Sequence, residues 1–278
     1  MKTILVINDR SAEADHAVEF ALEMARKAGA GILLWNTFQK PAVKKDLRIT
    51  VPYKSFAYTL SDEQEIASLH IEHLPSINYT EEFIIGHIYT TGYSPDNIAD
   101  FVVKKNIWLV VKGTRYCGDD QSVFEDDNTQ AILNKISCPL LLIPETTPLK
   151  GFEKIVYTAD LRYCRLEVIR LLVQMGRPYG ADILVAHISA KGLPEIDEQH
   201  ASDVFAKEIS SNINYENLFF NHIREKNIPR AIDVMVDVMR TDLLVLVNHK
   251  FHFEEIVGHK FSGRLPEYLH VPLLVFPS

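Results

Sequence analysis

Short apolar runs alternate with helix-like stripes along the first part of the chain. Residues 4–7, 32–36, 108–111 and 139–143 are rich in branched aliphatic side chains, which is typical of strands covered on both faces. Between the first two runs, apolar residues recur every three or four positions over residues 14–25, the pattern of an amphipathic helix. The chain therefore begins with a predicted strand–helix–strand unit, whose crossover should be right-handed.

Local signals mark the ends of the predicted helices. Ser11 is a good N-cap for the first helix, and Gly29 is placed to stop it. Ser94 and Pro95 open another helix, because proline suits a first helical turn. The remaining segments are predicted helices over residues 61–74 and 129–136 and a predicted strand over residues 79–85, whereas residues 39–60 fit neither pattern. Five strands alternating with four helices predict a doubly wound parallel α/β sheet.

The same pattern then returns in the second part of the chain. Asp160 follows an apolar run just as Asp9 does, at a spacing of 151 residues (160 − 9 = 151). Residues 177–185 match residues 26–34 at the same spacing. An ungapped match over a strand, a helix and a second strand indicates an internal duplication.

The second copy is shorter than the first. Pro272 follows its counterpart Pro139 at a smaller spacing than the one that separates Asp160 from Asp9, so residues are missing between the second and third strands. We expect two domains, residues 1–146 and 152–278, joined by a short polar linker. In the second domain the predicted helices cover residues 195–211, 228–239 and 264–269, and the predicted later strands cover residues 215–221, 243–247 and 273–276.

Composition narrows the class of protein. The 278 residues are 47% hydrophobic and 24% charged, as in a globular protein that folds in water. The net charge of −8 argues against binding to nucleic acid or to an anionic membrane surface. There is no run of about 18 apolar residues to predict a membrane span, and no signal peptide is visible. The three widely spaced cysteines are interpreted as reduced thiols, so a cytoplasmic protein is expected.

The order of these elements resembles a tandem universal stress protein. The resemblance rests on the turn at residues 9–11, the Gly-Ala pairs at residues 29–30 and 180–181, the Gly-Thr pair at residues 113–114, and the Cys-Pro-Leu-Leu segment from residue 138. It implies a Rossmann-like, five-stranded parallel sheet in each half. It also implies that the two sheets pair through their last strands as an intramolecular pseudo-dimer, which would cover two exposed sheet edges.

One branch of this family binds ATP through Gly-x2-Gly-x9-Gly-(Ser/Thr) after the fourth strand, with an aspartate at the end of the first strand. Carried over to the first copy, Asp9, Gly113 and Thr114 are kept. Tyr116 replaces the second glycine, and residues 126–127, both aspartate, replace the final Gly-Ser. These aspartate carboxylates would lie beside the ATP phosphates, and two like charges ~4 Å apart at an effective dielectric constant of ~20 repel by about 4 kcal/mol. We therefore predict no ordinary ATP binding there.

The second copy departs further from the ATP motif. It keeps Asp160 but has no glycine at the first motif position. At the start of the predicted helix, Ser262 is the only residue of a type that binds phosphate. Its loop is cationic, so a small anion could bind without the family motif. The candidate cofactor-binding residues are Asp9, Gly113, Thr114, Arg115, Asp160, Asn248, Lys250 and Ser262.

Each group of candidate residues also has an alternative interpretation. Asp9 and Asp160 could contact a ribose, or they could simply interact with the start of the following helix. His249, His252 and His259 could ligate zinc, although solvated loop histidines are commoner and no metal is expected. An acidic loop at residues 119–127 could bind a cation or a basic partner, with a solvated loop as the default interpretation.

No catalytic machinery is visible, because the chain lacks a Gly-x-Ser-x-Gly elbow and a Walker loop. The favoured hypothesis is a stress-response protein that is no enzyme, needs no cofactor and acts by binding a protein or a small anion. One alternative is an ATP-binding switch or weak ATPase using the first domain. Another is a ligand or metal sensor using the histidine-rich loop at residues 249–259. Beyond the intramolecular pseudo-dimer, two copies of the chain could also form a homodimer.

Overall fold

The computed structural model describes residues 2–37, 54–59, 70–72, 84–90, 92–115, 129–190, 192–250, 252–258, 265–266 and 269–278. The strands of the first half are β1 (Thr3–Asn8), β2 (Gly31–Asn36), β3 (Lys54–Thr59), β4 (His70–Glu72), β5 (Ile84–Tyr89), β6 (Leu109–Thr114) and β7 (Leu140–Pro144). Those of the second half are β8 (Lys154–Ala159), β9 (Asp182–His187), β10 (Leu218–His222), β11 (Leu243–Val247) and β12 (Leu273–Phe276).

Seven α-helices lie within the described residues. They are α1 (Ala12–Ala28), α2 (Pro95–Lys104), α3 (Thr129–Leu133), α4 (Leu166–Gly176), α5 (Glu198–Val204), α6 (Ile228–Asp237) and α7 (Phe253–Val257). A short 3-10 helix, η1 (Leu161–Tyr163), precedes α4, and another, η2 (Arg177–Tyr179), follows it. A π-helical segment, η3 (Phe205–Ile209), and a 3-10 turn, η4 (Ser210–Asn212), continue α5.

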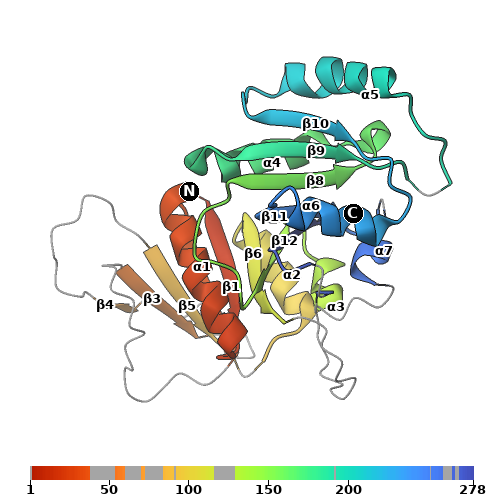
Figure 1. The fold of residues 1–278 in the computed structure, drawn as a ribbon. Helices are drawn as coiled ribbons and strands as arrows, with labels where there is room; N and C mark the ends of the chain where they lie inside the picture. The colour runs from red at the N-terminus through yellow and green to blue at the C-terminus, as the bar shows by residue number, and fades with distance from the viewer. Residues whose placement is uncertain are drawn as a thin grey trace.

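Twelve strands of the described chain form one sheet, in the order β10-β9-β8-β11-β12-β7-β6-β1-β2-β5-β3-β4 (Figure 1). Pairing is parallel within each half except between β3 and β4, as expected of a Rossmann-like α/β fold. From the middle outwards, the order β7-β6-β1-β2-β5 in the first half corresponds to the order β12-β11-β8-β9-β10 in the second. The strands β3 and β4 extend the first half beyond the five strands predicted for it.

Strand register is also the same in the two halves. Thr3 lies opposite Gly31 in the β1–β2 pair, and Lys154 lies opposite Asp182 in the β8–β9 pair. Both partners in the second pair stand 151 residues after those in the first. Helix-ending glycines precede β2 and β9 with φ angles of 60° and 64° at Gly29 and Gly180, a backbone conformation that glycine adopts without strain.

The two halves meet where β7 pairs antiparallel with β12. Leu141 lies opposite Leu274 at the centre of this pairing, flanked by the pairs Leu140–Val275 and Leu142–Leu273. All six side chains are fully buried. The register is symmetric, because the residue pairs on either side of the Leu141–Leu274 pair are exchanged by a two-fold rotation.

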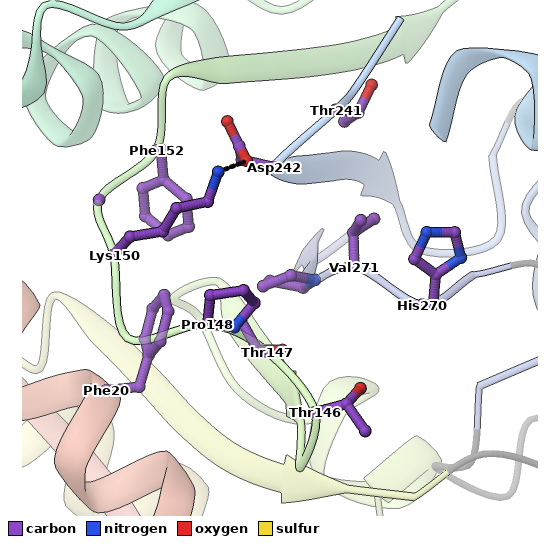
Figure 2. Close-up of a pocket in the computed structure, with 12 residues that line it drawn as sticks. Phe20, Thr146, Thr147, Pro148, Lys150, Phe152, Thr241, Asp242, His270 and Val271 are labelled. Carbon is purple, nitrogen blue, oxygen red and sulfur yellow. Dashed lines mark ion pairs between the residues drawn. The ribbon is translucent and has the colours of Figure 1, made fainter. Parts of the chain in front are cut away.

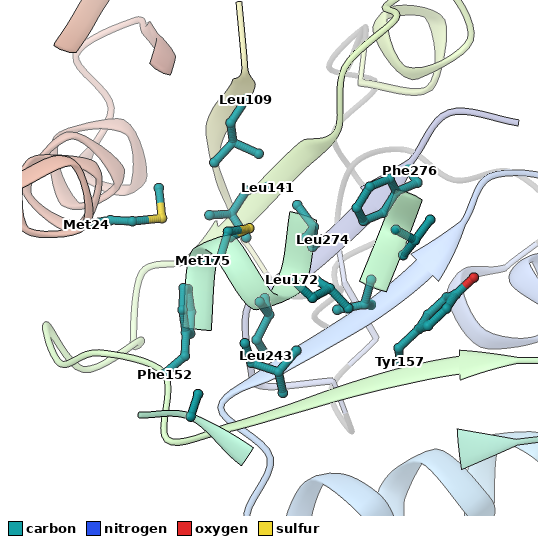
Figure 3. Close-up of a cluster of buried hydrophobic side chains, with 14 of the residues drawn as sticks. Met24, Leu109, Leu141, Phe152, Tyr157, Leu172, Met175, Leu243, Leu274 and Phe276 are labelled. Carbon is teal, nitrogen blue, oxygen red and sulfur yellow. The ribbon is translucent and has the colours of Figure 1, made fainter. Parts of the chain in front are cut away.

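Helices cover both faces of the sheet. One buried cluster contains residues from α1, α4 and α5, and the other contains residues from α2, α3, α6 and α7. Figure 3 shows Met24 of α1 and Met175 of α4 over the sheet residues Leu141 and Leu274. One continuous core therefore spans both halves beneath α1 and α4, since its members share buried contacts across the β7–β12 pair. In the described residues no helix is long and apolar enough to cross a membrane.

The predicted helix ends are confirmed where the side-chain signal was local. The Ser11 hydroxyl accepts a hydrogen bond from the N–H of Ala14 at 3.2 Å, and Gly29 ends α1. Ser94 accepts from the N–H of Asn97 at 3.2 Å, with Pro95 in the first turn of α2. Each contact satisfies a backbone donor that the helix itself leaves unpaired.

Several predicted elements were wrong. The helix expected over residues 61–74 is contradicted at His70–Glu72, which form β4 against β3; the remainder of that range lies outside the described residues. Of the strand predicted over residues 79–85, Ile84 and Ile85 are confirmed as the start of β5, which continues past Gly86 to Tyr89, whereas residues 79–83 lie outside the described residues. The helix expected over residues 264–269 is contradicted at Leu265, an extended bridge residue whose N–H donates to the Arg115 carbonyl at 3.0 Å. In each case, pairing with a distant segment outweighs local propensity.

Candidate functional site

The carboxyl ends of β1, β2 and β5 are joined by buried side-chain amides. The Asn8 Nδ2 donates to Asn36 Oδ1 at 3.1 Å, and the Asn36 Nδ2 donates to the Ile88 carbonyl at 3.0 Å. Both asparagines are buried, so these bonds satisfy polar groups that would otherwise be costly to bury. They fix the edge of the sheet at which open α/β folds bind ligands.

Asp9 lies exposed at this edge and folds a local turn. Its Oδ1 accepts from the N–H of Ser11 at 2.9 Å. Arg10, between them, has a left-handed φ of 67°, and its N–H donates to Asn8 Oδ1 at 3.0 Å. The aspartate therefore stabilises the entry into α1, which supports the local interpretation of this residue.

Gly113 packs directly beneath the first turn of α1. A Cβ added to it would lie 2.2 Å from the carbonyl oxygen of Glu13 and 2.8 Å from the nitrogen of Ala14. These are backbone atoms of a helix, so they cannot move aside cheaply. The glycine that the motif analysis assigned to phosphate contact is thus required for the close approach of α1 to β6.

Thr114 and Arg115 continue this contact. Thr114 is buried. The Arg115 guanidinium forms a two-point ion pair with Glu13, with Nε 2.7 Å from Oε1 and Nη2 2.9 Å from Oε2. The Glu13 side chain is only 15% exposed and lies in the first turn of α1, where the helix dipole favours negative charge. The predicted site residues 113–115 therefore hold α1 on the sheet.

In the second half, Asp160 is fully buried and enclosed by donors of its own chain. The Arg162 Nε donates to Oδ1 at 2.8 Å and its Nη2 donates to Oδ2. The backbone N–H groups of Arg162 and Ala190 donate to the carboxylate at 3.0 and 2.8 Å. Burial alone would raise the pKa of Asp160, but these hydrogen bonds outweigh it and lower the pKa. Asp160 is therefore an ionised, internally satisfied group.

Two histidines beside Asp160 were missed by the sequence analysis. His187 is fully buried at the end of β9 and its Nδ1 accepts from the N–H of Leu161 at 3.2 Å. Its ring centroid lies 4.9 Å from that of His222. Burial lowers the pKa of His187 despite the nearby Asp160 charge. A detectable signal did exist, because His187 stands 151 residues after Asn36, each being a polar residue that ends a buried strand.

A cavity of about 200 Å³ opens next to these histidines, at the carboxyl ends of β9 and β10. Its lining includes Ser189, Ala190, His222, Arg224 and Lys226. Arg224 is paired with Glu198, with Nη2 2.6 Å from Oε2. The cavity thus presents imidazole, hydroxyl and cationic groups at the expected ligand-binding edge.

The histidine-rich loop contributes to the wall of this cavity. The His252 ring is 7% exposed and lies between the Ser189 carbonyl, 2.8 Å from Nε2, and Glu255 Oε2, 3.0 Å from Nδ1. His259 lies outside the described residues. Among those described, no group of three histidine, cysteine or acidic side chains could hold a metal ion.

Asn248 and His249 contact the other half of the chain. The Asn248 Nδ2 donates to Asn134 Oδ1 at 2.9 Å, and the His249 Nε2 lies 3.0 Å from the same oxygen. Asn134 follows α3 directly. Lys250 is exposed, and its N–H closes a turn onto Val247 at 3.2 Å. Tyr116, residues 126–127 and Ser262, which carry the phosphate argument, lie outside the described residues.

A family model, the universal stress protein family, matches residues 1–144. Comparison with curated protein sequences finds no match.

Solved structures with this fold cover both halves of the chain. A protein of unknown function from Pseudomonas aeruginosa PAO1 superposes with a TM-score of 0.57 at 12% identity, covering 100% of this chain and 92% of that one. A putative universal stress protein from Pseudomonas aeruginosa UCBPP-PA14 gives 0.56 at 12% identity, covering 100% and 93%. A universal stress protein from Archaeoglobus fulgidus DSM 4304 gives 0.57 at 11% identity, covering 99% and 98%. The chain belongs to the universal stress protein family.

Proposed function

We propose that this chain is a stress-response protein of the cytoplasm that acts by binding rather than by catalysis. Its second half would be a diverged second universal stress protein domain. The proposal rests on one observation: the residues at the positions of the family's nucleotide site make contacts within this chain. Gly113 packs under α1, Arg115 is paired with Glu13, and Asp160 is enclosed by Arg162 and Ala190.

The proposed tandem arrangement is supported by reciprocal contacts between the halves. In the segment after β6, the Arg115 carbonyl accepts a hydrogen bond from the Leu265 N–H. In the segment after β11, Asn248 contacts Gln130 of α3 and Asn134, which directly follows α3. Arg115 and His249 hold equivalent positions when counted from the first residues of β6 and β11. Together with the symmetric β7–β12 register, these contacts have the isologous form of a two-fold dimer within one chain.

A decisive test is isothermal titration of the whole chain with ATP and magnesium. The proposal expects no binding at micromolar concentration, because Gly113 is packed against the backbone of α1, and Tyr116 and residues 126–127 replace the other positions of the phosphate motif. Micromolar binding with one site per chain would overturn it. Native mass spectrometry of freshly purified protein would report, in the same sample, any small anion that copurifies and whether two chains associate.

A second candidate function is an ATP-dependent switch or weak ATPase in the first half. The observation that favours it is the exposure of Asp9 at the carboxyl end of β1, in contrast to the enclosed Asp160. This function predicts that ATP raises the melting temperature and that Asp9→Ala abolishes the increase. Asp160→Asn is the matched control and should leave any increase unchanged.

A further inference from the structure

The linker holds the two halves together at the amino ends of β11 and β12, beside a cavity of about 330 Å³ (Figure 2). Lys150 Nζ lies 2.8 Å from Asp242 Oδ1, and the ring centroid of Phe152 lies 5.7 Å from that of Phe20 in α1. The edges at which the halves face each other are used by the β7–β12 pair. In the described part of the chain, the sheet therefore ends only at its outermost strands, β4 and β10.

The strand β10 holds the place in the second half that β5 holds in the first. Ile85 lies opposite Ile32 of β2, and Leu218 lies opposite Ile183 of β9, which stands 151 residues after Ile32. The outer side of β5 is covered by β3, which comes from the long segment between β2 and β5. The segment between β9 and β10 is shorter, and no described strand lies beyond β10 (Figure 1). The second half thus leaves open an edge that the first half covers with its own chain.

The outer side of β10 presents main-chain groups that have no partner among the described residues. The Ile223 N–H donates to the His187 carbonyl of β9 at 2.9 Å. Main-chain groups of a strand point alternately to its two sides, so those of Leu218, Phe220 and His222 point away from β9. A row of unpaired N–H and C=O groups is a template for pairing with another strand.

The residues of this edge do nothing to prevent such pairing. Edge strands are commonly protected by charged side chains or proline, but residues 218–222, Leu-Phe-Phe-Asn-His, contain no lysine, arginine, acidic residue or proline. Phe219 is 47% exposed. Its neighbour Phe220 points to the other face of the sheet and stacks on Phe205, with ring centroids 5.2 Å apart. An exposed phenylalanine on an unprotected edge strand favours contact with another chain.

The strand is self-complementary when two copies pair antiparallel about Phe220. Leu218 then lies opposite His222 of the other copy, and Phe219 lies opposite Asn221. The residues whose main-chain groups are unpaired meet one another, so each pair exchanges two hydrogen bonds. The two exposed Phe219 side chains lie diagonally across the two-fold axis on one face of the sheet, where they shield each other from water.

Charges at the two ends of the strand agree with the same register. Glu216 lies in the turn before β10 and Arg224 lies just after the strand, each four residues from Phe220, so Glu216 of one copy comes opposite Arg224 of the other. Both side chains are exposed. Glu216 makes no ion pair with a described residue, while Arg224 is paired with Glu198. In a parallel arrangement Glu216 would meet Glu216, so the charges select the antiparallel direction.

We propose that the outer edge of β10 binds a second copy of this chain, by antiparallel pairing centred on Phe220. The interface is isologous, because each copy contributes the same strand. It joins the two sheets into one and covers the edge that lacks a counterpart of β3.

The first test is the mass of the whole chain in solution. Light scattering after size-exclusion chromatography should give twice the mass of one chain at about 100 μM, since a specific association should have a dissociation constant below that value. A monomer at that concentration, with or without a copurified peptide, would overturn the proposal.

Two matched variants locate the interface. Phe219→Asp brings two like charges together across the axis and should be monomeric at the same concentration, with an unchanged melting temperature because the side chain is half exposed. Val103→Asp makes the same change on α2 of the first half, at a side chain that is 69% exposed, and should remain a dimer. A dimer that persists in Phe219→Asp, or one that is lost in both variants, would refute the assignment to β10.

A charge exchange tests the register. Glu216→Arg and Arg224→Glu each place like charges opposite one another in a homodimer, so each should weaken the dimer by about tenfold. In a mixed pair both contacts are again of opposite charge. Native mass spectrometry of an equimolar mixture should therefore show that heterodimers exceed the statistical fraction. A statistical distribution of pairs would refute the antiparallel register.

Discussion

The two halves of the molecule differ where the first strand passes into its helix. In the first half α1 begins at Ala12, three residues after Asp9; in the second, α4 begins at Leu166, six residues after Asp160. The first three of the intervening residues form the 3-10 turn η1. Apart from the added strands β3 and β4, the halves share their strand order and the register of the first two strands, so the difference is confined to the start of the helix.

The residue opposite the helix start explains the difference. Gly113 lets the backbone of Glu13 approach β6 so closely that even a Cβ would lie 2.2 Å from its carbonyl oxygen. The corresponding residue of β11, counted from the first residue of each strand, is Val247, and it is buried. A helix turn placed as in α1 would clash with that valine, so the second half begins its helix later. One glycine thus decides how a helix meets the sheet.

The largest expected effect tests what the halves have in common. Leu141→Asp and Leu274→Asp each place a charge at the fully buried centre of the β7–β12 pair. Each should cost more than about 4 kcal/mol of unfolding free energy, and the two costs should be similar because the residues occupy equivalent positions. Urea unfolding measures both values. A large cost for one variant and a small cost for the other would break the symmetry.

Gly113→Ala tests the contact that separates the halves. We expect a loss of about 3–4 kcal/mol in unfolding free energy, since the added methyl group overlaps helix backbone. Val247→Ala is the matched control and should cost about 1–2 kcal/mol for the lost apolar contacts. Chemical denaturation of both variants gives the comparison. A smaller cost for Gly113→Ala than for Val247→Ala would remove the packing role assigned to the glycine.

Asp160→Asn and Asp9→Asn compare the enclosed and the exposed aspartate. Asp160→Asn should cost about 2–4 kcal/mol, because it leaves the Arg162 guanidinium without its buried partner charge. Asp9→Asn should change the unfolding free energy by less than about 0.5 kcal/mol, since asparagine also forms this turn at the surface. Urea unfolding measures both losses of unfolding free energy. Equal losses would contradict the assignment of an enclosed aspartate to one strand end and an exposed aspartate to the other.

The smallest expected effect is the pH dependence of the stability lost in Asp160→Asn. The folded-state pKa of Asp160 is lowered, so its contribution is fully present above the unfolded value of about 3.9 and is lost as pH falls through the folded value. The stability difference between the parent chain and Asp160→Asn should therefore hold from pH 7 to about pH 5 and shrink in acid. Denaturant titrations at several pH values measure it. A difference that grew in acid would have the wrong sign.

Local patterns determined the elements that depend on neighbours in the chain. The sequence predicted the apolar strands and the helix ends at Ser11, Gly29 and Ser94, because periodicity and turn chemistry depend on residues only a few positions apart. It also showed the repeat, through the 151-residue spacing between Asp9 and Asp160. Family membership followed from their order, and the family model confirms it.

Candidate site residues were identified by type, but their roles depended on distant partners. Gly113 matched a phosphate-loop pattern and is needed for helix packing, Asn248 contacts Asn134 across the halves, and His187 was not singled out at all. The strand β4 and the extended Leu265 likewise depend on segments far away in the chain.

By itself, then, the sequence determined the repeated α/β pattern, because the alternation of buried and exposed positions is a property of each segment. Only the tertiary structure decided which glycine carries a helix, which aspartate is enclosed and where a cavity opens beside the linker. Those outcomes depend on the atoms that a fold brings within a few ångströms, and no local pattern of residues specifies them.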